Sequence, residues 1–119
     1  MIFSSSDPLH RVIVLKEGTW RSKILDKHPE VEEYLDVYKS LIANPYYIVR
    51  DLVESEPGKR VPHTTREEYV DFIPSKTDSK IILVKTVVDH VSNPGEVVTA
   101  FISSKLCITT EGGIIYVRS

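Results

Sequence analysis

The sequence predicts an α+β fold in which two N-terminal helices pack on a curved antiparallel β-sheet. Two patterns support this prediction. Apolar residues recur at helical spacing through residues 19–43, whereas short β-branched or alternating segments separated by turn residues fill the chain from residue 46 onward. Since helices and sheets must each bury an apolar side, we expect the helices to cover one face of the sheet. The opposite face is then the expected working surface.

Length and composition are those of one domain over residues 1–119. The chain has 119 residues, of which 41% are hydrophobic and 27% charged, as in ordinary globular proteins. No apolar run approaches the roughly 20 residues that span a bilayer, and the first residues lack the regions of a signal peptide. We therefore expect a cytoplasmic protein without a membrane partner. The single cysteine, Cys107, is predicted to be a buried thiol in a strand.

A short strand and a short helix are the first expected elements. Residues 11–16, RVIVLK, are mostly β-branched and predict a strand that Gly18 ends. Thr19 is a suitable helix cap, and Trp20 and Ile24 follow at a spacing that places both on one helical face. Trp20 is interpreted chiefly as a core anchor, with stacking on a base as the alternative.

The second helix has boundary signals at both ends. His28 occupies the cap region, Pro29 the first helical position, and Asn44-Pro45 the end. Acidic residues in the first turn match the positive end of the helix dipole, an interpretation that we prefer to a metal-binding role. The expected core side of this helix consists of Val31, Tyr34, Leu35, Tyr38, Leu41 and Ile42.

Strands make up the rest of the chain. Asn93-Pro94-Gly95 predicts a tight reversal within a central hairpin, and Glu111-Gly112-Gly113 predicts another at the C-terminus. The polar connection over residues 54–65 is a candidate mobile loop. The expected strands cover residues 46–53, 67–74, 80–89, 96–103, 105–110 and 113–119.

Charge and motifs restrict the chemistry. A net charge of −2 argues against a broadly basic nucleic-acid surface, although basic residues outnumber acidic ones over residues 10–28, where an anion could bind. The chain has no phosphate-binding glycine loop, no paired cysteines or closely spaced histidines for zinc, and no nucleophile elbow. We therefore expect no cofactor and no metal, which leaves chemistry by side chains alone.

Five residues are candidates for that chemistry, and each has a plainer alternative. His28, at a helix start, is either a neutral proton acceptor or only a cap. Arg21 and Lys23 either bind phosphate or are solvated helix charges. Thr99 either positions substrate or is an ordinary strand former, and Lys85 either reaches across the working face or prevents sheet association.

Four segments resemble a known family. TWRSKILDKHPE at residues 19–30, NPYYIVRD at 44–51, KIILVKTVV at 80–88 and EVVTAF at 96–101 are together similar to the phage- and toxin-associated nuclease-like domains grouped with barnase, EndoU, colicin and RelE. The similarity covers residues 11–103. It implies two helices on an antiparallel sheet.

The resemblance also implies a metal-independent endoribonuclease in which the ribose 2′-OH attacks the adjacent phosphate. His28 and Thr99 match the family's positions as catalytic residues, with Lys23 where members often carry a second histidine. Arg50 and Tyr69, on intervening strands, are the implied substrate contacts, beside Arg21 and Lys85. The implied partners are RNA, including tRNA, and an immunity protein.

Two further hypotheses stay open. Lysine at position 23 is a poor base unless its pKa falls far below about 10.4, so the chain could be a catalytically inactive module that binds RNA or a protein. The numerous strands also suit an interaction domain whose sheet edges pair with a partner.

Overall fold

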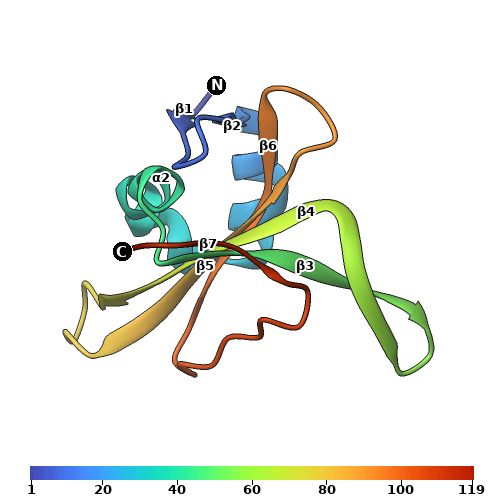
Figure 1. Ribbon diagram of the computed structural model, residues 1–119. Coiled ribbons are helices and arrows are strands. Elements are labelled where there is room, and N and C mark those ends of the chain that lie inside the picture. The colour runs from blue at the N-terminus through green and yellow to red at the C-terminus, as the bar shows by residue number, and fades with distance from the viewer.

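The computed structural model describes residues 1–119 and shows helical segments on one side of a curled sheet (Figure 1). The sheet has seven strands in the order β1-β2-β6-β5-β4-β3-β7. The α+β class is therefore confirmed. The elements are β1 (Phe3–Ser6), β2 (Val12–Leu15), η1 (Thr19–Ile24), α1 (Leu25–Lys27), η2 (Pro29–Tyr34), α2 (Leu35–Ala43), β3 (Tyr47–Glu56), β4 (Lys59–Pro74), β5 (Ile81–Asp89), β6 (Gly95–Ser103) and β7 (Ile114–Val117).

The sheet is antiparallel at every strand pair except one. β2 pairs parallel with β6 through Ile13 opposite Gly95 and Val14 opposite Glu96. The predicted central hairpin of β5 and β6 is confirmed, with Lys85 opposite Phe101. The start of the chain, for which the sequence predicted no strand, forms β1 and places Phe3 opposite Leu15.

Both predicted helices form, and each contains turns near its start that are not α-helical. The first runs over η1 and α1 and begins with π-helical turns, and the second runs over η2 and α2 and begins as a 3₁₀ helix after His28. Thr19 was predicted as the cap, but the capping position is Gly18, and no side chain caps this helix. The N–H groups of the first turn are therefore not held by a hydroxyl.

One apolar core joins helices and sheet. It contains side chains from η1, η2 and α2 together with strand residues such as Val84 and Val88. Trp20 is 4% exposed, so its interpretation as a core anchor is confirmed. Tyr38 donates a hydrogen bond of 2.6 Å from its hydroxyl to the Phe101 carbonyl and so ties α2 to β6.

The prediction of a loop over residues 54–65 is wrong. These residues are the outer half of a long β3–β4 hairpin, with Val53 opposite Val61 and Gly58 at the turn with φ 79°. The two strands run antiparallel. Their side chains are mostly polar and exposed, so the amino-acid composition of the hairpin is that of a loop. Figure 1 shows this hairpin projecting from the body as an arm.

The predicted C-terminal hairpin is also wrong. Residues 105–110 form no strand, and Cys107 is exposed rather than buried in one. β7 pairs instead with β3, where Tyr47 lies opposite Val117. β3 offered an unpaired edge, and Gly112 lies against the Arg50 carbonyl where a larger residue would not fit.

The sheet face away from the helices, the expected working surface, is partly covered, and it carries Lys85 opposite Val70 and Thr99 opposite Val87. The side chains of Val49, Val70, Leu83 and Val87 on this face are buried. Figure 1 shows the segment between β6 and β7 on the side of the sheet away from α2. No helix of the protein is long and apolar enough to cross a membrane.

Candidate functional site

The densest polar group in the protein lies where the β1–β2 turn meets β3, β4 and the end of β5. We call it the His90 cluster. Its members come from four separate parts of the chain, and hydrogen bonds or ion pairs connect all of them. They are Asp7, Arg11, Arg50, Glu67, Tyr69 and His90.

Asp7 builds the turn that begins the cluster. Its Oδ1 accepts hydrogen bonds from the backbone N–H groups of Leu9 at 3.0 Å and Arg11 at 2.9 Å. Its Oδ2 accepts from Arg11 Nε at 2.9 Å and from the Tyr69 hydroxyl at 2.7 Å. Because both oxygens of this buried carboxylate are occupied, Asp7 fixes the turn and orients the Arg11 side chain.

Glu67 is the central anion. Arg11 holds its carboxylate with two hydrogen bonds, Nη1 to Oε2 at 3.1 Å and Nη2 to Oε1 at 2.7 Å. Arg50 Nη1 lies 3.6 Å from Oε2, and His90 Nε2 lies 3.5 Å from Oε1. A carboxylate this deeply buried is stable because cations surround it.

The hydrogen bonds of Tyr69 determine which ring nitrogen of His90 carries the proton. The Tyr69 hydroxyl donates its one hydrogen bond to Asp7. Its oxygen is therefore an acceptor toward its other partners, Arg11 Nη2 at 3.2 Å and His90 Nε2 at 3.1 Å. His90 Nε2 must therefore be the donor. In the neutral ring this leaves a lone pair on Nδ1.

The surroundings of the cluster lower the pKa values of both His90 and Asp7. Burial lowers the pKa of His90, and the Arg11 and Arg50 charges lower it further against the opposing effect of Glu67 and Asp7. Burial alone would raise the pKa of Asp7, but hydrogen bonds from Tyr69 and Arg11 lower it below the usual range. Near pH 7, Asp7 is thus ionised and His90 is neutral.

An open cavity of about 300 Å³ adjoins the cluster. Gly95 packs against the His90 ring, since a Cβ at this position would lie 2.8 Å from Nδ1. The unprotonated nitrogen is therefore on the Gly95 side, which is a wall of the cavity. The cavity is lined by His10, Arg11, Val12, His90, Ser92, Asn93 and Gly95.

Arg50 and Tyr69 are the two predicted site residues that the structure brings together here. The sequence analysis did not predict the other four members of the cluster, and His90 belongs to no recognisable sequence pattern. One signal could have found Glu67: it precedes Tyr69 by two residues, so both point to the same face of β4.

A second group of predicted residues lies around Phe101. The His28 ring centroid is 5.7 Å from that of Phe101, and Lys85 Nζ lies 5.4 Å from the Phe101 centroid and 3.3 Å from Glu68 Oε1. Thr99 precedes Phe101 by two residues in β6, opposite Val87. Burial, with the nearby Asp51 charge, raises the pKa of Glu68, although Lys85 opposes this.

His28 is not held as a cap. Its side chain makes no capping hydrogen bond, and its Nδ1 lies 3.5 Å from Glu30 Oε1. Lys23 is exposed beside a different hollow that Arg66 and Glu96 also line. No hydrogen bond or ion pair joins His28, Lys23 and Thr99 to one another, so their common catalytic role stays a prediction.

Arg21 lies apart from both groups. Its Nε is paired with Glu17 Oε1 at 2.9 Å, on the exposed side of η1. Only Nε is engaged in this pair, so the phosphate-binding role of Arg21 stays a prediction.

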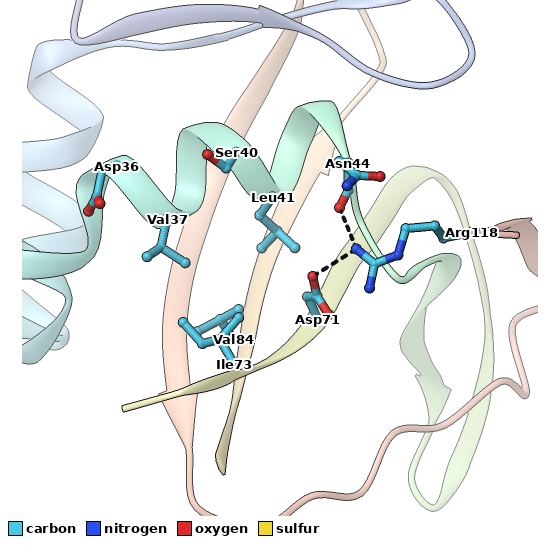
Figure 2. Close-up of a pocket in the computed structure, with 9 residues that line it drawn as sticks. All are labelled: Asp36, Val37, Ser40, Leu41, Asn44, Asp71, Ile73, Val84 and Arg118. Atoms are coloured by element: carbon cyan, nitrogen blue, oxygen red, sulfur yellow. Dashed lines mark hydrogen bonds and ion pairs between the residues drawn. The ribbon is translucent and has the colours of Figure 1, made fainter. Parts of the chain in front are cut away.

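A further cavity, of about 250 Å³, lies between α2 and the sheet (Figure 2). Arg118 closes one end by donating to the Asn44 carbonyl at 3.1 Å and to Asp71 Oδ2 at 3.2 Å. Figure 2 shows Leu41 and Val84 projecting between the helix and the strands. This cavity contains no histidine or cysteine, and we interpret the Arg118 contacts with Asn44 and Asp71 as a clamp on the C-terminus.

No group of three or more histidine, cysteine, aspartate or glutamate side chains is arranged to hold a metal ion. Comparison with protein-family models, with curated proteins and with solved structures finds no match for this chain. The class of protein must therefore be inferred from the geometry of the His90 cluster.

Proposed function

We propose that the protein is a metal-independent endoribonuclease, of the toxin or phage-associated type, whose active site is the His90 cluster. One observation supports this most directly. His90 lines the cavity, its Nε2 is held by Tyr69, and its Nε2 also lies 3.5 Å from the buried carboxylate of Glu67. This is the arrangement of a general base with an orienting group.

The proposed step is attack of the ribose 2′-oxygen on the adjacent phosphorus, with departure of the 5′-oxygen and formation of a 2′,3′-cyclic phosphate. His90 Nδ1 accepts the 2′-OH proton. Glu67 stabilises the resulting imidazolium because its Oε1 lies 3.5 Å from Nε2. Arg11, which lines the cavity with a side chain 31% exposed, is the cation proposed to neutralise the phosphoryl oxygens. Arg50, 29% exposed, pairs with Glu67 and does not line the cavity.

The residues around Phe101 are the rival catalytic set. His28 would be the base or acid there, with Lys85 neutralising phosphate, Thr99 positioning it, and Lys23 and Arg21 as outlying contacts. The shared packing of His28 and Lys85 on Phe101 supports this set. It lacks a defined cavity and an orienting partner for the imidazole other than Glu30.

Single-histidine variants separate the two sets. The protein is incubated with total RNA or tRNA in EDTA, and the fragment ends are analysed. We expect 2′,3′-cyclic phosphate ends, a loss of about 100-fold or more in rate for His90→Ala, and little change for His28→Ala. His63→Asn is the matched control, since asparagine can replace the ring as acceptor from Thr65 N and Arg66 N.

The opposite pattern, with His28→Ala inactive and His90→Ala active, would move the site to Phe101. Absence of cleavage by the pure parent protein would refute the proposal altogether.

A catalytically inactive RNA-binding module on the same fold is the second candidate. The absence of catalysis is favoured by Arg11, whose guanidinium already bonds Asp7, Glu67 and Tyr69. This module would bind labelled RNA with a salt-dependent affinity and release no product. If it is indifferent to RNA, a protein such as an immunity protein is the remaining partner, to be sought by co-purification.

A further inference from the structure

His10 is a second imidazole on the wall of the cavity beside His90. Its side chain is exposed and takes part in no hydrogen bond or ion pair. Its backbone has φ 65°, in the left-handed region where glycine is common and where asparagine, aspartate and histidine are the most frequent other residues.

The Asp7 turn imposes this conformation. The backbone N–H of Asp7 donates to the Arg11 carbonyl at 2.9 Å, and that of His10 donates to the Asp7 carbonyl at 2.9 Å. With the two bonds to Asp7 Oδ1, these contacts close the turn from both sides. The same turn places Arg11 in the His90 cluster and His10 on the cavity wall, so the two residues are presented together.

We propose that His10 is the second acid–base residue of this site, donating a proton to the departing 5′-oxygen of the RNA. The inference rests on the proposed ribonuclease function. Two-sided proton transfer needs one group that accepts and another that donates, on either side of the phosphate. Two imidazoles line the cavity. His90, which is hydrogen-bonded to Tyr69, is the proton acceptor, and the exposed His10 is the proton donor.

The step is balanced without a metal or a co-reactant. The bond from the 2′-oxygen to phosphorus forms, and the bond from phosphorus to the 5′-oxygen breaks. The 2′-OH proton passes to His90 Nδ1, and a proton from the His10 imidazolium passes to the 5′-oxygen. Proton exchange with water then restores both rings.

Substitution by glycine tests this role without the risk of unfolding. Glycine adopts φ near 65° freely, so His10→Gly should melt at or above the parent's temperature. We expect it to cleave RNA about 100-fold more slowly. On a uridine 3′-(4-nitrophenyl phosphate) substrate, whose leaving group needs no proton, it should stay within about threefold of the parent. Leu9→Ala, in the same turn, is the control and should cleave both substrates normally.

The outcomes separate this inference from the proposed function. If the parent cleaves RNA and His10→Gly cleaves it equally well, His10 has no catalytic role and the ribonuclease proposal stands. If His10→Gly slows the cleavage of both substrates equally, His10 is not the general acid. If the parent cleaves neither substrate, both proposals are refuted.

Discussion

Asp7 and Glu67 show how single residues create the site. Each is a buried carboxylate that accepts a hydrogen bond from a distant part of the chain, Asp7 from Tyr69 and Glu67 from Arg11. Asp7 accepts a hydrogen bond from the Tyr69 hydroxyl, so the Tyr69 oxygen is an acceptor toward His90 and the neutral His90 ring carries its proton on Nε2. The reactivity of His90 thus depends on a residue that does not contact it through a hydrogen bond.

The lowered pKa of His90 predicts a pH-dependent stability. In the unfolded chain a histidine titrates near pH 6.5, whereas burial and the arginines lower the pKa of His90 in the folded state against Glu67 and Asp7. Below pH 6.5 the unfolded state therefore binds more protons, and the free energy of unfolding falls as the pH drops toward the folded pKa. Urea denaturation at several pH values measures this loss.

His90→Gln should remove that part of the pH dependence, since glutamine does not titrate and can still donate to Tyr69. His63→Asn is the control and should keep it. An identical pH profile for the parent and His90→Gln would mean that the His90 environment is not as described.

At the scale of elements, the β3–β4 arm differs from the rest of the sheet. β7 reaches only as far as Val49 on β3, and β5 only as far as Arg66 on β4. Beyond these points the two arm strands pair with each other alone, and their side chains are largely exposed. A two-stranded hairpin is marginally stable in water.

Backbone amides of the arm should therefore exchange with solvent much faster than those of the central strands. Hydrogen exchange followed by mass spectrometry should show early deuteration over residues 52–64 and late deuteration over β5, because local opening of the arm does not require global unfolding. Equal protection of the arm and β5 would indicate that a partner or a second copy covers the arm.

The whole molecule is held by the core between the helices and the sheet. Ile42 of α2 has no exposed surface and belongs to this core with strand residues such as Ile48. Apolar burial of this kind is the dominant favourable contribution to folding. A small domain depends on each buried side chain because its surface is large relative to its volume.

Ile42→Ala should destabilise the protein by about 3 kcal/mol, from lost apolar burial and the cavity left behind. Val91→Ala is the matched control: Val91 is 74% exposed, and the change should stay within about 0.5 kcal/mol. Urea denaturation gives both values. A small effect at Ile42 would mean that α2 does not pack as the structure shows.

Much of the local structure was predictable from the sequence. The strand after Arg11, the extents of both helices and the β5–β6 hairpin were predicted, because periodicity and turn residues act over a few positions. The arm and the C-terminal segment were predicted wrongly. A polar hairpin resembles a loop in composition, and residues 105–110 alternate like a strand although they pair with no strand of the sheet.

The sequence by itself determined the α+β class and two members of the candidate site, Arg50 and Tyr69, which were chosen through a family resemblance. Only the tertiary structure joined them to Asp7, Arg11, Glu67 and His90. The physical reason is that alternation along a strand specifies which face a side chain occupies, whereas its neighbours depend on strand order and on how the β1–β2 turn packs. The protonation of His90 is further removed from the sequence, because it follows from hydrogen bonds among residues that only folding brings together.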